Sequence, residues 1–437
     1  MTNQFLNTLN LLIPKLETAT VYVAISGGID SMVLTELCLA NQIKPHLLHC
    51  NFNLRGKESD EDQLFIEAFA RANQLEYTIK HFETDQIANE KGITIQECAR
   101  NLRYDWFKSF LVNRQAVLFT AHHLNDSIET FFINTLRGTG IKGLKGIPQQ
   151  RGQIIRPLLT VTKQEILLFA EKNNISYRND SSNESDKYLR NKIRHYIVPE
   201  MEQLSDNYSK KMQTLLNELQ DADDFLDDYV LKFKKKEFLT NHEITKVNIN
   251  SLLELPTVII TKIFSGFGIT RASTSQIQKL IQAQSGANIS TEYYRFVKNR
   301  DQIHIAPLTS PIDFKASVTL SAKNIETPYG NLKFEIMPNS GQLDFSSHVA
   351  YFDLETFSFP LEVSNHFKGK KISPLGMKGR KLISDILIDN KLSVFDKERQ
   401  LILTSGNNVL WVVNICINEL NKINPNTKRI LKVVYTE

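Results

Sequence analysis

The sequence has few of the features that mark secreted, disulfide-bonded or membrane-spanning proteins. Its four cysteines contain no Cys-x-x-Cys pair, which excludes a disulfide framework and is typical of a reducing cytoplasm. The longest apolar run near the C-terminus, 409–413, is far shorter than the roughly 18 residues needed to cross a bilayer. No basic residue precedes Lys15, as a secretory signal would require. We therefore expect a cytoplasmic protein that does not enter a membrane.

Length and charge indicate several domains and a polyanionic partner. At roughly 150 residues per domain, 437 residues predict about three domains. The residues are 41% hydrophobic and 23% charged, which is ordinary globular usage. Positive charge is concentrated in 360–437, where 13 Lys and Arg face 7 Asp and Glu. Such a basic segment favours contact with nucleic acid, although a solvated surface would have the same composition.

The first two hundred residues alternate short, branched apolar runs with segments of helical period, which predicts a doubly wound α/β domain with a parallel sheet. The predicted strands are 21–25, 45–50, 75–82 and 116–121, and the predicted helices are 32–40, 61–73, 94–113 and 126–136. Ligands of such a sheet collect at the carboxyl ends of its strands.

The rest of the chain predicts two further domains. Apolar residues at helical spacing over 208–226 predict a helical domain, and the acidic cluster at 221–228 is interpreted as a solvated face. After Pro311 the apolar period becomes two, with a hairpin turn at 405–408 and a flexible basic loop at 366–381, so this part is expected to be mostly β. The predicted domains are 1–200, 201–310 and 311–437.

A short loop directly after the first strand is a candidate phosphate site. Residues 26–31 read Ser-Gly-Gly-Ile-Asp-Ser and open the first helix, where free backbone N–H groups and the helix dipole favour an anion. The Lys of a Walker loop and the glycines of a dinucleotide fingerprint are both missing. Asp30 beside a phosphate makes sense if Mg²⁺ neutralises both, so it is the candidate metal-bridging residue.

Further polar motifs follow the fourth strand. His122 and His123 precede Asp126 and Glu129, an arrangement that also suits zinc ligands or the start of a helix. The glycine-rich, basic run 136–148 is interpreted as a mobile anion-binding loop. A turn is predicted at 179–183. Beyond it, Arg190 and Arg194 stand four residues apart, so two guanidinium groups on one helix face would suit a phosphate or a carboxylate.

The loop at 26–31 resembles that of the PP-loop pyrophosphatase family, which implies transfer of AMP from ATP with release of pyrophosphate. The further motifs resemble those of the tRNA(Ile)-lysidine synthetase family within it. The matching elements are Ser26 to Ser31, His49 with 54–56, Glu97 with Arg100, Arg103-Tyr104, His122-His123 with Asp126 and 129–130, 136–138 with Gly140, 156–158, and Arg190-Asn191 with Arg194. Two departures are Asn125, where the family has an acid, and Phe52, where it commonly has a histidine.

The resemblance implies an enzyme that joins lysine to C2 of the wobble cytidine of an isoleucine tRNA with a CAU anticodon, through an adenylated cytidine. It implies ATP, Mg²⁺, tRNA and free lysine as cofactor and partners, while the oligomeric state stays open, with a homodimer as one option. The implied catalytic residues are Asp30, Asp126 and Glu97; the ATP-binding residues are Ser26, Gly27, Gly28, Ile29, Asp30, Ser31, His49 and His122; the substrate-binding residues are Arg100, Arg103, Arg137, Arg190, Asn191 and Arg194. The alternatives are a tRNA thiolase of the same superfamily, which usually carries Cys-x-x-Cys motifs, and a non-catalytic ATP- or RNA-binding protein.

Overall fold

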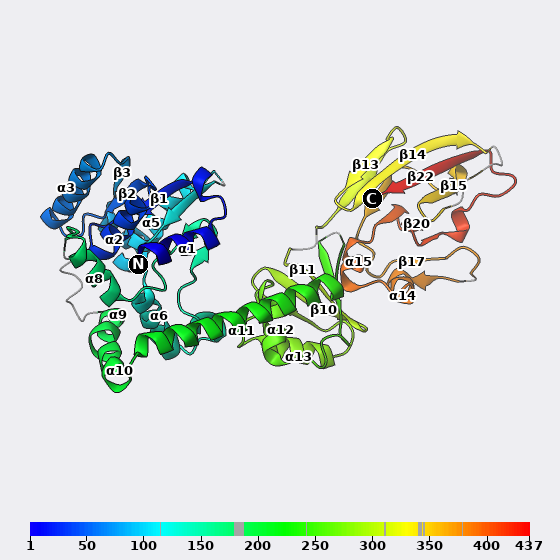
Figure 1. Ribbon diagram of the computed structural model, residues 1–437. Helices are drawn as coiled ribbons and strands as arrows, with labels where there is room; N and C mark the ends of the chain where they lie inside the picture. Colours follow the sequence, from blue (N-terminus) through cyan, green and yellow to red (C-terminus); the bar gives the residue numbers. More distant parts are fainter. Residues whose placement is uncertain are drawn as a thin grey trace. The chain divides into compact units, whose positions relative to one another are not determined.

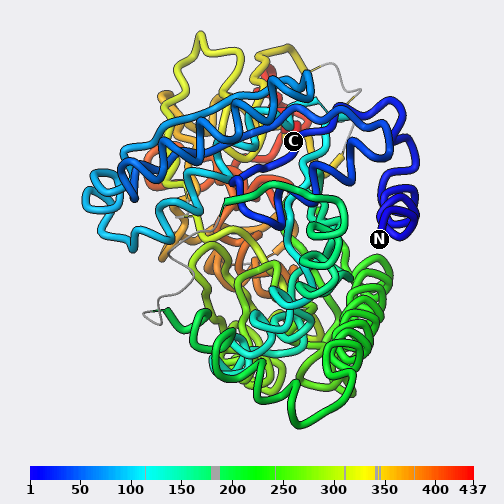
Figure 2. Tube along the Cα trace, turned by 60° about the vertical axis from the view of Figure 1, so that its left-hand side comes forward, coloured from blue at the N-terminus to red at the C-terminus, as the bar shows by residue number. Residues whose placement is uncertain are grey.

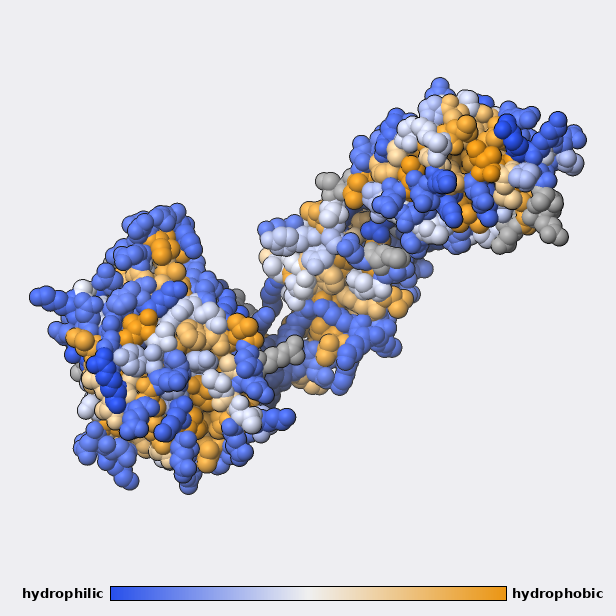
Figure 3. All heavy atoms as spheres, turned by 90° about the horizontal axis from the view of Figure 1, so that it is seen from above, coloured by the Kyte–Doolittle hydropathy of each residue, from blue (hydrophilic) through white to orange (hydrophobic). Residues whose placement is uncertain are grey.

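The computed structural model describes residues 1–437 except 114, 179–187, 242, 310–311, 340–342, 344–345 and 378. The chain forms two compact units, Met1–Leu226 and Asp227–Glu437. The turn predicted at 179–183 and Lys378 of the predicted basic loop lie outside the described residues. In the part that is described, no helix is long and apolar enough to cross a membrane. On the face drawn in Figure 3, hydrophilic residues predominate and hydrophobic ones are scattered among them.

A six-stranded sheet in the order β3-β2-β1-β4-β6-β5 forms the centre of the first unit (Figure 1). All its neighbouring strands are parallel except β5 and β6. The strands are β1 Thr20–Ala24, β2 His46–Asn51, β3 Tyr77–His81, β4 Ala116–Phe119, β5 Gln150–Arg151 and β6 Ile154–Ile155. Because β1 pairs with β2 on one side and β4 on the other, the strand order reverses between β1 and β4, which is where such sheets bind ligands.

Helices cover both faces of this sheet. They are α1 Thr2–Leu12, η1 Leu16–Thr18, α2 Ile29–Ala40, α3 Lys57–Ala72, α4 Thr84–Lys91, α5 Ile95–Phe110 and α8 Lys163–Lys172. The helices α1 (dark blue in Figure 1 and Figure 2), α2 and α8 share one core cluster with Val21 and Val23 of β1. On the other face, Phe107 of α5 packs with Leu48 and Leu118. The predicted doubly wound α/β domain is therefore confirmed, with α1, η1, α4 and α8 as helices beyond the four that were predicted.

A second group of helices packs beside the sheet. Its members are α6 Leu124–Leu136, α7 Ile141–Leu144, α9 Leu189–Lys192, η3 Ile193–Ile197, α10 Val198–Leu204 and α11 Tyr208–Glu237. Leu124 and Ile128 of α6 share a buried cluster with Tyr208, Met212 and Leu216 of α11. The helix predicted over 208–226 is confirmed, and Figure 1 shows α11 as one long rod.

The buried face of α11 differs from the face predicted by the spacing of the apolar residues Tyr208, Met212, Leu215, Leu219, Ala222 and Leu226. Leu215 is 38% exposed, whereas Leu216 is buried. Asp223, interpreted as part of a solvated face, is only 1% exposed, and its carboxylate lies 2.6 Å from the ammonium nitrogen of Lys145. The interpretation was wrong for Asp223 because its partner comes from the distant 136–148 run. A basic residue that looked like part of a mobile loop therefore anchors this loop to α11.

The second unit begins with a domain that is only partly helical. Besides the end of α11 it contains α12 Thr257–Ser265 and α13 Thr274–Gln282, and a five-stranded sheet, β7-β8-β11-β10-β9. The strands are β7 Phe238–Asn241, β8 Ile244–Asn248, β9 Asn288–Ser290, β10 Tyr294–Asn299 and β11 Gln302–Pro307. The residue pattern did not predict this sheet. In β11, for example, Ile303, His304 and Ile305 are all buried, so the alternation typical of a half-exposed strand is lost.

The remaining part is mostly β, as predicted. Its strands are β12 Lys315–Val318, β13 Asn324–Thr327, β14 Gly330–Pro338, β15 Val349–Asp353, β16 Leu361–Ser364, β17 Lys371–Ile372, β18 Lys381–Leu382, β19 Ile402–Ser405, β20 Asn408–Val412, β21 Cys416–Ile417 and β22 Arg429–Thr436. The helices are η4 Leu354–Thr356, α14 Ile383–Asp389, α15 Val394–Arg399 and η5 Glu419–Asn421. The hairpin at 405–408 is confirmed by the pairing of β19 with β20. The described residues of the basic segment 366–381 include the paired strands β17 and β18, so this segment is a small hairpin instead of a loop.

Candidate active site

The predicted phosphate loop lies between β1 and α2, at the point where the strand order reverses. Gly27 has φ +82°, a conformation that side chains rarely adopt, so glycine is required there. The Ser31 hydroxyl donates a 2.9 Å hydrogen bond to the carbonyl of Gly28, and it accepts one of 3.2 Å from the backbone N–H of Ser26. These bonds close residues 26–31 into a compact turn at the start of α2, a geometry that suits an anion.

The loop opens into a cavity of about 1530 Å³. The carboxyl ends of β1, β2 and β4 and the starts of α2, α6, α8 and α11 contribute to its wall. Of the predicted site residues, the cavity is lined by Ser26, Gly28, Ile29, Asp30, Ser31, His49, Arg103, His122 and Arg194. Glu129, which belongs to the motif at 122–130, also lines it.

Two histidines in the wall are held in the neutral form. Burial lowers the pKa of His122 to about 4, and its Nδ1 lies 3.0 Å from the Thr120 hydroxyl. Burial also lowers the pKa of His49, whose Nδ1 lies 3.0 Å from the carbonyl of Ile25. A carbonyl only accepts, so Nδ1 of His49 carries the proton and Nε2 is an acceptor. Nε2 is buried and has no hydrogen-bond partner among the described residues.

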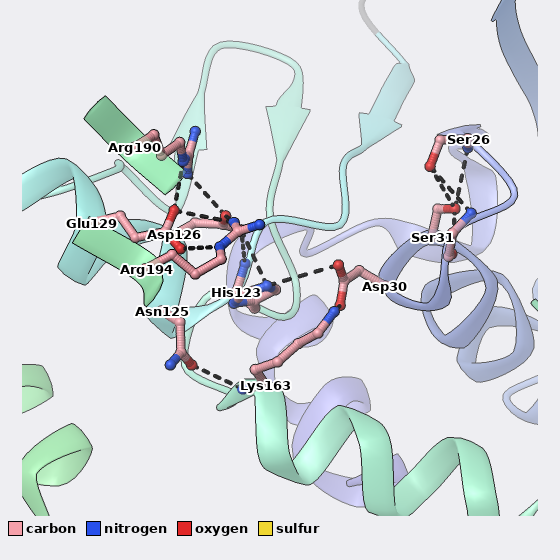
Figure 4. A network of polar contacts seen from close by, with 11 residues as sticks. Ser26, Asp30, Ser31, His123, Asn125, Asp126, Glu129, Lys163, Arg190 and Arg194 are labelled. Carbon is pink, nitrogen blue, oxygen red and sulfur yellow. Dashed lines mark hydrogen bonds and ion pairs between the residues drawn. The ribbon is translucent and has the colours of Figure 1, made fainter. Parts of the chain in front are cut away.

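Two acids and two arginines form a group of ion pairs beside the cavity, which we call the acid–arginine cluster: Asp126, Glu129, Arg190 and Arg194 (Figure 4). Glu129 is 1% exposed, and its carboxylate lies 2.6 Å from Nε of Arg190 and 2.6 Å from Nε of Arg194. Arg190 also donates a 2.9 Å hydrogen bond to Asp126. Both arginines therefore bind carboxylates of the protein itself, and the two acids balance their charges.

The charges of the cluster keep one another ionised. Burial acts to raise the pKa of Asp126, but His123 and Arg190 outweigh it, so the pKa lies below its ordinary value. Burial acts to lower the pKa of Arg194, but its hydrogen bond to Glu129 outweighs this, and the pKa is raised. The carboxylate of Asp126 also accepts a 2.9 Å hydrogen bond from the backbone N–H of His123, which fixes the start of α6.

Asp30 lies between two basic side chains at the mouth of the phosphate loop (Figure 4). Its carboxylate is 2.6 Å from the ammonium nitrogen of Lys163 and 3.8 Å from Nε2 of His123. The side chain of Asn125 accepts a 2.9 Å hydrogen bond from the backbone N–H of Lys163. Asn125, which stands where the family has an acid, thus joins the start of α6 to the start of α8.

Asp30 fits a magnesium ion as a single ligand. Among the described residues, no group of three or more His, Cys, Asp or Glu side chains could hold a metal ion by itself. Mg²⁺ usually binds one or two carboxylates together with the phosphates of its substrate, and it keeps several waters. One carboxylate beside a phosphate loop meets that requirement, whereas a zinc site at His122 and His123 would need further protein ligands. His123 instead stands directly before α6, as its N-cap.

Some predicted residues are not brought to the cavity wall, and these include Gly27, Asp126 and Arg190. Glu97 is exposed in the first turn of α5, where its backbone N–H is capped by the Thr94 side chain, and Arg100 is exposed on the same helix. Arg137 is exposed at the end of α6. Asn191 lies in α9, beside Arg190. The roles proposed for these residues remain predictions.

The residue pattern missed Lys163 and Arg178, two basic cavity residues that contact the phosphate loop. Lys163 is separated from Asp30 by more than a hundred residues, so no local spacing links them; Thr162-Lys163-Gln164-Glu165 signals only a capping box. Arg178 lines the cavity, and its backbone N–H donates a 2.9 Å hydrogen bond to the carbonyl of Gly27. Its side chain is held by Asp62, 2.6 Å away.

Comparison with known proteins identifies the family. A PP-loop domain model matches residues 1–201, a TilS substrate binding domain model matches 240–308, and a TilS substrate C-terminal domain model matches 361–434. Among solved structures, the U34-tRNA thiolase NcsA from Methanococcus maripaludis is 20% identical with a TM-score of 0.42 and covers 50% of this chain and 77% of its own. A TilS C-terminal domain is 19% identical with a TM-score of 0.26 over 28% of this chain and 97% of its own.

Curated relatives match almost the whole chain. The tRNA(Ile)-lysidine synthase of Parabacteroides distasonis is 32% identical over 98% of this chain and 99% of its own length. That of Bacillus subtilis is 30% identical over 93% of this chain and 91% of its own length. Full-length similarity of this kind, together with a PP-loop domain and both TilS domains, places the chain in the tRNA(Ile)-lysidine synthase family.

Proposed function

We propose that the protein ligates lysine to C2 of the wobble cytidine of the isoleucine tRNA with a CAU anticodon, and releases AMP and pyrophosphate. The observation that carries this proposal is that the phosphate loop and two members of the acid–arginine cluster, Glu129 and Arg194, line one cavity, in a chain similar over its length to lysidine synthases. A cavity of about 1530 Å³ has room for more than one reactant.

The first step activates the cytosine. Its C2 oxygen attacks the α-phosphorus of ATP, the bond from that phosphorus to the bridging oxygen breaks, and pyrophosphate leaves. We assign binding of the diphosphate to the backbone N–H groups at the start of α2 and to the hydroxyl of Ser26, while Ser31 holds the turn closed, and Asp30 would hold Mg²⁺ there. When bound, Mg²⁺ neutralises the charge that develops on the leaving diphosphate.

The nucleotide itself would lie along the ends of β1, β2 and β4. Nε2 of His49 is a free acceptor in the cavity wall and suits the exocyclic amine of adenine or a ribose hydroxyl. His122 is neutral, so it adds polarity beside the phosphates without a charge that titrates near neutral pH. Exclusion of water by the cavity strengthens each of these contacts.

The second step transfers lysine. The ε-amine attacks C2 of the adenylated cytosine, the C2–oxygen bond breaks, and AMP leaves with that oxygen. The amine must be neutral to attack, so a nearby carboxylate has to orient it and accept its proton. We assign this role to Asp126 in preference to Glu97, because Asp126 belongs to the acid–arginine cluster whereas Glu97 is exposed on α5.

The rest of the chain would bind tRNA. We propose an adenylation domain at 1–200, a tRNA-binding domain at 201–310 and a basic tRNA-recognition domain at 311–437, a division supported by the three family matches. The anticodon loop is single-stranded, so one cytidine can enter the cavity without melting a duplex. Free cysteines and a tRNA substrate favour a cytoplasmic location.

The test is one incubation with ATP, Mg²⁺, labelled lysine and an unmodified CAU isoleucine tRNA transcript. We expect equal amounts of AMP, pyrophosphate and lysine-labelled tRNA, and no labelling of methionine tRNA with the same anticodon. Conversion of ATP to ADP and phosphate, or no consumption of ATP, would refute the proposal. Sulfur transfer to the tRNA from an added sulfur donor would identify a thiolase instead.

A further inference from the structure

Lys163 is a cavity residue to which the proposed reaction gives no role. Its ammonium nitrogen lies 2.6 Å from Asp30, the proposed magnesium ligand, and both side chains line the cavity. In Figure 4 the Lys163 side chain extends from the start of α8 towards the phosphate loop and ends at Asp30. The contact therefore joins the loop to a helix that begins far along the chain.

The position of Lys163 is electrostatically unfavourable for α8 alone. It is the first residue of the helix, where the dipole is positive and a cation is repelled. The N-terminus of α2 lies at the phosphate loop and is also positive. Two helix N-termini and one lysine thus lie near Asp30, with His123 3.8 Å from its carboxylate, while Glu165 offsets part of the positive end of α8. Positive potential at the mouth of the phosphate loop suits an anion.

The backbone of Lys163 is fixed while its side chain remains able to move. The Thr162 side chain and Glu165 form a capping box at the start of α8, with bonds of 3.2 Å and 2.7 Å. The side chain of Asn125 binds the backbone N–H of Lys163 at 2.9 Å. The side chain itself is 35% exposed and has four flexible methylene groups, so its ammonium group can exchange partners within the cavity.

A purely structural ion pair explains the contact less well. Pairs as exposed as Lys163 and Asp30, at 35% and 31%, contribute little to folding. In the acid–arginine cluster the arginines are as exposed as Lys163, but their shared carboxylate, Glu129, is 1% exposed, whereas Asp30 is 31% exposed.

We propose that Lys163 is a diphosphate-binding residue, whose ammonium group leaves Asp30 for an oxygen of the diphosphate when magnesium-ATP binds. The exchange frees the Asp30 carboxylate for the cation and adds a charge-assisted hydrogen bond to the leaving group. In this way one lysine couples occupation of the phosphate loop to the availability of the metal ligand. The inference rests on the proposed function, because it assigns a residue to the same site.

The test measures binding, without turnover, in three variants of the full-length protein: Lys163→Met, Lys163→Arg and, as a control on the exposed end of α8, Lys172→Met. For α,β-methylene-ATP in Mg²⁺, measured by calorimetry, we expect Lys163→Met to weaken binding about tenfold or more. Lys163→Arg keeps the charge and should stay within about threefold of wild type, as should Lys172→Met.

A second measurement separates the exchange from a general loss of structure. Mn²⁺ binding to the protein without nucleotide, followed by electron paramagnetic resonance, should become tighter in Lys163→Met, because the competing ammonium group is gone. Wild-type nucleotide affinity in Lys163→Met, or Mn²⁺ binding that is unchanged or weaker, would overturn the proposal. Circular dichroism verifies that each variant is folded. Lack of lysidine formation by a wild-type protein that binds the nucleotide normally would refute the proposed function instead.

Discussion

Glu129 and Arg194 form a 2.6 Å ion pair in which the carboxylate is 1% exposed and the arginine 35% exposed. Arg190 binds the same carboxylate, so two guanidinium groups are held by one buried acid. A buried acid of this kind is costly to desolvate, and its removal leaves both arginines sharing the carboxylate of Asp126. The cluster therefore fixes α9 and η3 against α6, and it holds the side chain of Asp126 in place.

The first prediction is that Glu129→Ala destabilises the first unit by about 3–5 kcal/mol, the usual cost of breaking a buried ion pair from one side. Glu129→Gln should cost less, because the amide keeps part of the hydrogen bonding. Urea unfolding followed by circular dichroism measures the difference. The matched control is Asp105→Asn, an exposed partner of Lys108, which should change stability by less than about 1 kcal/mol. Equal effects of Glu129→Ala and Asp105→Asn would show that the cluster does not stabilise the fold.

The second prediction concerns Asp126, the acid assigned to the lysine amine. Asp126→Asn keeps the shape of the side chain but removes its charge, so lysidine formation should fall by at least about a hundredfold, the usual contribution of a general base. Binding of tRNA, measured by filter retention, should not change. Asp221→Asn on the exposed face of α11 is the control. Normal turnover by Asp126→Asn would refute the assignment.

The sequence was sufficient wherever a feature depends on neighbouring residues. The strands, the phosphate loop after β1 and the hairpin at 405–408 follow from short patterns of apolar, glycine and turn residues. Features that join distant segments were not predictable in the same way. The pairing of Lys163 with Asp30 and the burial of Asp223 depend on tertiary contacts.

The same distinction applies to the substrate-binding residues. The spacing of Arg190 and Arg194 predicted that both could bind one carboxylate or phosphate of a substrate; in the structure both bind the protein's own Glu129, and their role in substrate binding stays a prediction. The sheet of β7 to β11 was missed because burial on both sides of β11 removes the period of two. Local chemistry thus predicted the kind of site, whereas the partner of each charged side chain required the fold.

The third prediction is that His122 makes the fold less stable in mild acid. Its pKa of about 4 in the folded protein lies below the ordinary value of 6.5, so the unfolded chain binds more protons between these two values. Stability should therefore be full above pH 6.5 and should fall as the pH drops towards 4, by roughly 1–3 kcal/mol from this residue. Urea unfolding across this range gives the free energy of unfolding at each pH, and this free energy should depend less steeply on pH in His122→Asn than in the wild type. A variant of the exposed His81 should keep the wild-type pH dependence. An unchanged pH dependence in His122→Asn would contradict the prediction.

The fourth prediction compares two acids on α11. Asp223 is buried against Lys145, whereas Asp221 is exposed two residues earlier on the same helix. Asp223→Asn should destabilise the first unit by about 3 kcal/mol, because it leaves Lys145 without its partner in a largely buried position. Asp221→Asn should have an effect within about 0.5 kcal/mol of zero. Similar unfolding midpoints for the two variants would indicate that the ion pair does not anchor the loop.

The fifth prediction is that the basic hairpin around β17 and β18 contacts tRNA phosphates. Deletion of 360–437 is a poor test, because it would remove β16 and β22, the partners of β12 and β14. Substitution of the exposed residues Lys368, Lys371 and Arg380 by Ala leaves those strands intact.

Each lost phosphate contact should reduce the slope of log affinity against log salt by about 0.7–0.9, so the triple variant should lose roughly 2 units of slope and bind tRNA more weakly at low salt. Fluorescence anisotropy with labelled tRNA, between 50 and 300 mM KCl, measures both quantities. Substitution of exposed Lys323 and Lys333, from a different part of the second unit, is the control and should keep the wild-type slope. If both sets of variants show the wild-type slope, the tRNA is bound by other residues and the positive charge of this hairpin is a solvated surface.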